Sequence, residues 1–194
     1  MIINIESLKA SNTLIKRAIL TQAEYYPTTH CDERPDNTDI SLLVIHNISL
    51  PPNQFGGDHI KSFFTGNLDP DLNEFFTEIY KMRVSAHCLI QRSGHIVQFV
   101  PFDKRAWHAG VSSFQGKSRC NDFSIGVELE GTDHIAYTDA QYQSLTTLSK
   151  ALTNQYPMIN LSRIVGHNDI APSRKTDPGI SFDWIRYRQL LLCK

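Results

Sequence analysis

The sequence predicts an α/β protein of one domain, with a central mixed β-sheet flanked by helices. Short apolar runs rich in branched residues alternate with segments whose apolar residues recur every three or four positions. One hairpin signal adds an antiparallel pair to strands that are otherwise separated by helices, which is typical of a mixed sheet. The length of 194 residues fits a single domain.

Four runs are expected as strands, the second of them as a hairpin: 41–46, 88–100, 123–131 and 162–167. The first ends before Pro51 and Pro52, because proline cannot donate to a sheet ladder. The hairpin turns at Gly94, which supplies the positive φ that the turn needs. In the third run, Glu128 and Glu130 fall on the face opposite the branched apolar residues.

Three other segments have the apolar spacing of helices: 58–82 in pieces, 138–156 and 182–192. The second begins with a capping box in which Thr138 and Gln141 satisfy each other's backbone amides. Ser181 is the expected N-cap of the last helix. A weaker helical pattern covers residues 11–25.

Residues 1–40 are expected to form an N-terminal arm and linker, and residues 41–194 the catalytic domain. The segment TTHCDERPDNTD, which precedes the first buried strand, is polar and contains proline, as linkers often do. We therefore interpret the arm as a linker and do not expect a second domain there.

Composition excludes several classes of protein. The formal net charge is −1 and the hydrophobic share is 41%, which is ordinary for a globular chain and poor for wrapping a phosphate backbone. The first twenty residues lack the features of an export signal, and no apolar stretch is long enough for a membrane helix. We therefore expect a cytoplasmic protein with neither a nucleic-acid nor a membrane partner, and the mixed surface favours a monomer.

Three residues are candidate metal ligands. His46 and His167 each stand at the end of an apolar strand, where open α/β sheets place their sites, and Asp177 lies in the long polar loop that follows. Two imidazoles and a carboxylate suit Zn²⁺ with a free position for water. A histidine at a strand end is also often a hydrogen-bonded structural residue, and Asp-Pro-Gly is a common turn, so the residues alone leave both interpretations open.

Four further side chains are candidates for the chemistry. Glu128 and Glu130 share a strand face, and either is an inward general base or a solvated residue. Lys175 stands two residues before Asp177 and would reach a developing oxyanion if that aspartate holds a metal. Trp107, followed by His108, offers a ring for stacking on a sugar, although a core position is equally compatible with the sequence.

Three stretches of the chain resemble the zinc-dependent N-acetylmuramoyl-L-alanine amidases: LLVIHNISLPP, RVSAHCLIQRSGHIVQFVPFDKRAWHAGVSSFQGKSRCNDFSIGVELEGTD and GHNDIAPSRKTDPG. The likeness is strongest to the cytosolic subgroup of peptidoglycan recycling. It implies the mixed-sheet fold shared by amidases and peptidoglycan recognition proteins. It also implies hydrolysis of the amide between (1,6-anhydro-)N-acetylmuramic acid and L-alanine, a soluble anhydro-muropeptide as substrate, and an indirect link to β-lactamase induction.

The resemblance implies a role for each candidate residue. His46, His167 and Asp177 would hold one Zn²⁺ per chain. Glu128, rather than the second carboxylate of its strand, would be the catalytic acid and base, and Lys175 would stabilise the oxyanion. Substrate contacts are implied for four further residues: Asn47, Arg83, Trp107 and Arg119.

Two other functions are compatible with the same scaffold. A non-enzymatic peptidoglycan sensor would keep the groove but typically lacks a metal ligand, whereas all three expected ligands are present here. A lytic amidase would act on polymeric cell wall, which the likeness to the recycling subgroup disfavours.

Overall fold

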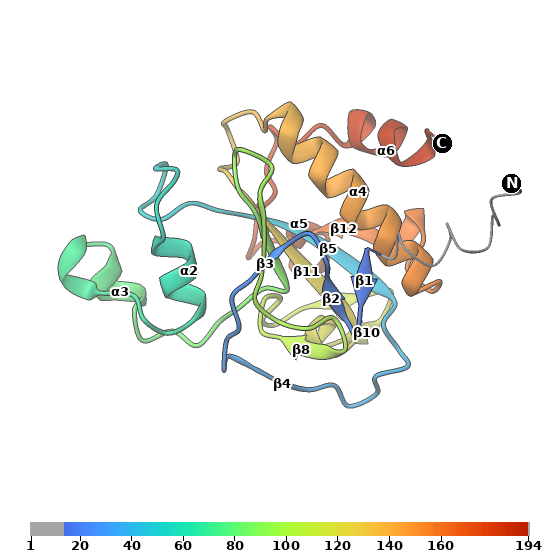
Figure 1. Ribbon diagram of the computed structural model, residues 1–194, viewed down its shortest axis with the longest axis horizontal. Coiled ribbons are helices and arrows are strands. Elements are labelled where there is room, and N and C mark those ends of the chain that lie inside the picture. Colours follow the sequence, from blue (N-terminus) through green and yellow to red (C-terminus); the bar gives the residue numbers. More distant parts are fainter. Residues whose placement is uncertain (1–13, 194) are drawn as a thin grey trace, which may run out of the picture.

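The computed structural model describes residues 14–193, which are built around a six-stranded mixed sheet of order β12–β5–β11–β6–β7–β3 (Figure 1). Neighbouring strands are parallel except for the β6–β7 hairpin. The strands are β3 (Glu24–Tyr25), β5 (Leu42–Ile48), β6 (Cys88–Ile90), β7 (Ile96–Gln98), β11 (Ser124–Glu130) and β12 (Ile164–Gly166). The predicted fold class, an α/β domain with a central mixed sheet, is confirmed.

Helices and three small two-stranded sheets surround the central sheet. The small sheets pair β1 (Ile15–Lys16) with β2 (Ile19–Leu20), β4 (Cys31–Glu33) with β8 (Lys104–Ala106), and β9 (Ser113–Phe114) with β10 (Lys117–Ser118). The α-helices are α2 (His59–Phe64), α3 (Phe76–Ile79), α4 (Asp139–Gln155), α5 (His167–Ile170) and α6 (Trp184–Leu192). Single 3-10 turns lie at η1 (Pro70–Leu72), η2 (Cys120–Asp122) and η3 (Leu161–Arg163).

The two faces of the sheet have different coverings. Helices α4 and α6 lie together over one face, while α2 and α3 lie to one side (Figure 1). Ile45 and Val127 point to the α4 face and pack with Leu145 and Tyr187 in the main core. Because side chains alternate along a strand, the residues next to Ile45 and Val127 point to the other face. That arrangement places His46 and Glu128 on the face that α4 and α6 leave free.

The predicted hairpin and the predicted capping box both occur. Gly94 has φ +84° and lies against α4, since a Cβ atom there would come within 2.9 Å of the Ala140 carbonyl oxygen. Thr138 Oγ1 accepts from the Gln141 amide at 3.1 Å, and the Gln141 side chain accepts from the Thr138 amide. The prediction of Ser181 as the N-cap of the last helix is wrong, because the capping side chain is Asp183.

The helix predicted for residues 11–25 is wrong over its described part, and residues 11–13 lie outside the described residues. The chain instead forms β1, β2 and β3, with a turn at Arg17 and Ala18, both of positive φ. The buried side chain of Gln98 accepts from the Leu20 amide at 2.7 Å and donates to the Ala18 carbonyl at 3.0 Å. These long-range hydrogen bonds prevail over a weak local helical preference.

The described part of the predicted arm is joined to the domain. Strand β3 pairs with β7 at the edge of the central sheet. Arg34 is 6% exposed, and burial lowers the pKa of its guanidinium to about 10. The guanidinium donates to four backbone carbonyls, those of Asn121, Asp122, Phe102 and Ser124. The division of the chain at residue 41 stays a prediction.

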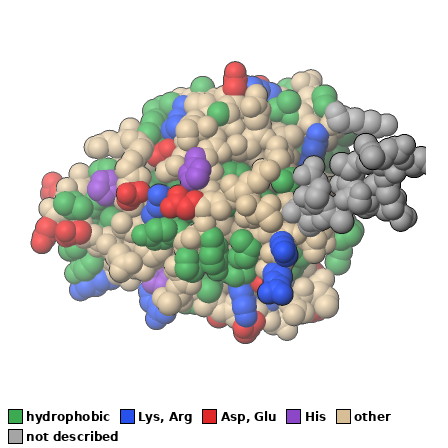
Figure 2. Space-filling view, viewed as in Figure 1, with side chains coloured by type: hydrophobic (Ala, Val, Ile, Leu, Met, Phe, Trp, Pro, Cys, Tyr) green, Lys and Arg blue, Asp and Glu red, His purple; other side chains and the backbone are tan. Residues whose placement is uncertain are grey.

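The surface carries charges of both signs. On the face shown in Figure 2, Lys and Arg side chains lie among Asp and Glu side chains, and a group of hydrophobic side chains lies below the middle. Within residues 14–193, every helix is too short or too polar to traverse a lipid bilayer.

We predict that Arg34→Met destabilises the protein by roughly 2–4 kcal/mol, because it leaves several buried carbonyls without a donor. Urea unfolding measures the free energy of unfolding. Arg186→Met is the matched control, since it breaks an exposed ion pair with Asp139 and costs about 1 kcal/mol at most. Equal stability of the two variants would show that Arg34 does not anchor the N-terminal segment.

Candidate metal centre

Strand register brings the predicted site residues together. In the parallel pair β5–β11, His46 lies opposite Glu128. In the pair β12–β5, Gly166 lies opposite Ile45, so His167, the next residue, comes beside His46. Both histidines therefore lie at the carboxyl ends of neighbouring parallel strands, the edge at which open α/β sheets hold their sites.

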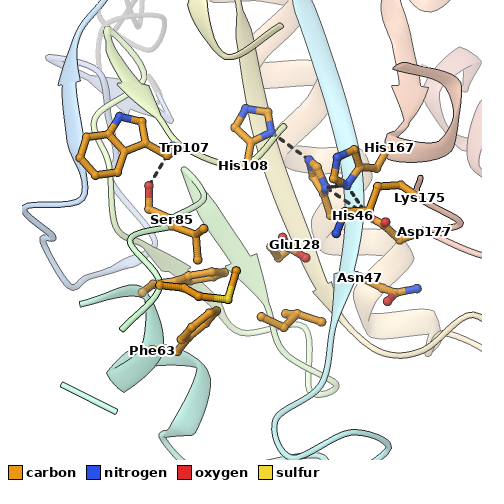
Figure 3. Close-up of a pocket in the computed structure, with 14 residues that line it drawn as sticks. His46, Asn47, Phe63, Ser85, Trp107, His108, Glu128, His167, Lys175 and Asp177 are labelled. Carbon is orange, nitrogen blue, oxygen red and sulfur yellow. Dashed lines mark hydrogen bonds and ion pairs between the residues drawn. The ribbon is translucent and has the colours of Figure 1, made fainter. Parts of the chain in front are cut away.

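His46, His167 and Asp177 form one compact cluster (Figure 3). The two Nδ1 atoms lie 2.9 Å apart, and Asp177 Oδ2 is 3.1 Å from the first and 3.0 Å from the second. Within residues 14–193 this is the one group of three or more His, Cys, Asp or Glu side chains close enough to share a cation. No fourth protein donor belongs to the cluster in this part of the chain.

The Asp177 carboxyl is held in its ionised form. The Asn168 amide donates to the Asp177 carbonyl at 3.0 Å, which ties the loop to the start of α5. Burial opposes ionisation of the carboxyl, but its close polar contacts with the His167 and His46 rings outweigh burial and hold the pKa of the carboxyl well below its usual range. A carboxylate at this position supplies the negative charge that a bound cation requires.

The protonation of the histidines also suits a metal. Burial lowers the pKa of His46 to about 4, so its ring is neutral at physiological pH. His167 Nε2 lies 3.2 Å from the Ala109 carbonyl oxygen, which can only accept, so this nitrogen carries the proton. With its proton on Nε2, the His167 ring directs the lone pair of Nδ1 into the cluster. Two imidazole nitrogens and a carboxylate oxygen are a fitting donor set for zinc.

Glu128 lines the same pocket. Its Oε2 atom has no hydrogen-bond partner, although only 9% of the residue is exposed to solvent. Burial raises the pKa of its carboxyl well above the usual range, Asp177 raises it further, and Lys175 opposes the shift. Glu130, the alternative on the same strand face, accepts instead from the amides of Gly56 and Arg92. The structure thus distinguishes two carboxylates that the sequence alone did not.

Lys175 borders the pocket and also a second hollow beside it. Asn47 and Asp177 line both hollows as well. The two hollows therefore meet at the cluster, which leaves room for a ligand to extend in two directions from it. The Lys175 ammonium group makes no hydrogen bond or ion pair with the described part of the protein, and it is free to face a ligand.

The structure places the predicted substrate contacts unevenly. Asn47 and Trp107 line the pocket, and Asn47 donates to Asp133 Oδ1 at 2.9 Å. Arg83 and Arg119 do not line it. Arg83 lies over the Trp107 ring at 5.4 Å, and the Arg119 side chain is 70% exposed and pairs with Asp122.

An apolar wall of the pocket was absent from the sequence-based prediction. In Figure 3 Trp107 and Phe63 lie across the pocket from the histidine cluster, with Glu128 between. The wall comprises Phe63, Phe64, Met82 and Val84. The helical spacing of residues 58–82 indicated buried residues there, but the sequence does not show that this segment lines the pocket opposite the histidines.

The chain belongs to the N-acetylmuramoyl-L-alanine amidase family, whose pattern it matches over residues 36–180. It resembles the 1,6-anhydro-N-acetylmuramyl-L-alanine amidase AmpD of Citrobacter freundii, with 60% identity over 178 residues, 92% of this chain and 95% of that protein. The family expected from the sequence is confirmed.

Solved structures agree with this assignment. The crystal structure of a selenomethionine derivative of AmpD has 60% identity and a TM-score of 0.89, and covers 92% of this chain and 99% of that one. The amidase AmiD of Escherichia coli, solved in complex with anhydro-N-acetylmuramic acid-L-Ala-D-γ-Glu-L-Lys, has 32% identity and a TM-score of 0.58. That match covers 78% of this chain and 57% of AmiD.

We predict that the purified protein binds about one zinc ion per chain, as a three-ligand site does. His46→Ala should reduce zinc content far below one, because two protein ligands rarely retain the ion. Elemental analysis after dialysis measures the content. His95→Ala is the matched control, because its exposed ring pairs with Glu24. Undiminished zinc in the His46 variant would contradict the assignment.

Proposed function

We propose that the protein is a zinc-dependent amidase that cleaves the bond between (1,6-anhydro-)N-acetylmuramic acid and L-alanine of the stem peptide, in peptidoglycan recycling. The observation that carries the proposal is the meeting of two histidines and an aspartate with the unpaired Glu128 carboxyl in one pocket. The names of relatives about 60% identical over nine-tenths of the chain support the substrate class.

His46, His167 and Asp177 would hold the zinc. Zinc in such a site polarises a carbonyl group and makes a water molecule acidic near neutral pH, which amide hydrolysis requires. All three side chains line the pocket, so the site is accessible to substrate.

Glu128 would move the protons. Its raised pKa favours a carboxyl that accepts a proton from the attacking water and then gives it to the departing amine of L-alanine. Lys175 would place its positive charge near the carbonyl oxygen, which gains negative charge as the tetrahedral species forms. The two side chains thus act on the water and on the carbonyl oxygen respectively.

Substrate binding is assigned to both hollows. An amide substrate has groups on each side of the bond that breaks, and the hollows extend in two directions from the cluster. Trp107 would lie against the sugar, and Asn47 would donate to the substrate next to the cluster. Arg83, which lies over the Trp107 ring, and the exposed Arg119 would bind carboxylates of the peptide.

Four further expectations stay predictions: the cytoplasmic location, the monomeric state, the link to β-lactamase induction, and residues 41–194 as the catalytic unit.

We predict that Glu128→Gln lowers kcat on soluble anhydro-muropeptide by roughly 10²–10⁴-fold, because the amide cannot accept the proton of water. Release of peptide is followed by chromatography, and zinc content should stay near that of the wild type. Glu130→Gln is the matched control. Glu130 binds two backbone amides outside the pocket, so its loss should lower stability and leave kcat within a few-fold.

Full activity of Glu128→Gln would remove this residue from the mechanism. A wild-type protein that binds anhydro-muropeptide but releases no peptide would instead identify a peptidoglycan sensor.

We predict that the wild type releases peptide from soluble anhydro-muropeptide at least about tenfold faster, by kcat/KM, than from intact sacculi, a difference of about 1.4 kcal/mol in transition-state stabilisation. The same chromatographic measurement applies to both substrates at equal concentration of cleavable bonds. Faster release from sacculi would favour a lytic amidase.

A further inference from the structure

We propose that His108 and the following residue Ala109, held in place by Asn121, position the two metal-binding histidines. The inference rests on the proposed zinc site and assigns roles to residues outside the ligand set. His108 and Asn121 would be positioning residues, because they act through His46 and His167 and not on the substrate.

His108 contacts the first histidine ring directly. His108 Nδ1 lies 2.9 Å from His46 Nε2, and the two rings meet edge to face with centroids 5.0 Å apart. On its other side, His108 Nε2 lies 3.1 Å from Ser124 Oγ. The three side chains thus form a hydrogen-bonded row that leads away from the cluster.

The row determines which nitrogen of His46 carries the proton. A neutral His46 can direct a lone pair from Nδ1 into the cluster only when its proton is on Nε2. That proton needs an acceptor, and His108 Nδ1 is the atom at hydrogen-bond distance. His108 then carries its own proton on Nε2 and donates it to Ser124 Oγ.

The second histidine is oriented by the next residue along the chain. The Ala109 carbonyl oxygen accepts from His167 Nε2 at 3.2 Å, and it also accepts from the Arg174 guanidinium at 2.7 Å. A backbone carbonyl accepts in every protonation state, so His167 has a fixed partner. Consecutive residues of one short segment therefore face the distal nitrogens of both predicted ligands.

Asn121 fixes that segment. Its side-chain Oδ1 accepts from the backbone amides of both His108 and Ala109, at 3.1 and 2.8 Å. One side-chain oxygen thus holds the peptide groups on both sides of the His108 Cα atom, directly before the Ala109 carbonyl group. Displacing it would shift the acceptors of both histidines together.

Gly126 provides the space for the His108 ring. A Cβ atom at Gly126 would come within 2.4 Å of His108 Cγ and 2.5 Å of Nδ1. The ring therefore lies directly on the backbone of β11, between Ser124 and the cluster. Its position is set by packing on a rigid strand as well as by hydrogen bonds, as a positioning residue requires.

The test compares variants of His108 that keep or lose the acceptor. His108→Phe keeps the ring and removes Nδ1, whereas His108→Asn keeps an oxygen where Nδ1 stood. Outer hydrogen-bond partners of metal ligands typically contribute about 10–100-fold to metal affinity. We therefore expect the zinc affinity of His108→Phe to fall by about 10–100-fold. The zinc affinity of His108→Asn should stay within roughly threefold of the wild type. Competition with a chromophoric chelator measures the affinity, and circular dichroism checks the fold.

Asn121 has its own matched pair. Asn121→Asp keeps the accepting oxygen, and Asn121→Ala removes it, so weaker zinc binding is expected for Ala and not for Asp. In wild-type protein loaded with zinc, long-range ¹H–¹⁵N spectra should show the His46 proton on Nε2 and the His108 proton on Nε2. A proton on Nδ1 of His108 would overturn the assigned direction of the row.

The outcomes separate this inference from the proposed function. A wild type without zinc affinity would refute the zinc site itself. Normal zinc affinity in the wild type and in folded His108→Phe would refute the positioning role and leave the amidase proposal intact. A His108→Phe variant that does not fold leaves the spectra of the wild type and the Asn121 pair to decide.

Discussion

The site depends on the parallel register of β5 between β12 and β11. One step in that register would turn every side chain of a strand to the opposite face, and His46 would enter the core beneath α4. The observed register sets His46 beside Glu128 on one side and beside His167 on the other. Residues 121 positions apart therefore meet without any local sequence signal that links them.

Features set by near neighbours in the chain were predictable. The Thr138 capping box, the turn at Gly94 and the apolar run of β5 each depend on a few adjacent residues, and each occurs. The N-terminal strands were not predictable in this way. Their conformation depends on hydrogen bonds to Gln98, a residue about eighty positions away, and a weak helical pattern gave the opposite expectation.

The same distinction applies to the candidate site. The structure brings His46, His167 and Asp177 close together, whereas the residues alone left the metal interpretation open and the family resemblance favoured it. Spacing could not separate Glu128 from Glu130, because residues two apart share a strand face. Asn121 and the apolar wall at Phe63 escaped notice, since their relation to the histidines exists only in three dimensions.

Arg34 connects the N-terminal segment to this part of the molecule. Its guanidinium binds the carbonyls of Asn121 and Ser124, the residues whose side chains support the His108 row. A ligand that binds more tightly when this row is well ordered would, by thermodynamic reciprocity, also stabilise the docked form of the segment that carries Arg34. The packing of the N-terminal segment and the geometry around the histidine cluster therefore share the backbone of Asn121 and Ser124.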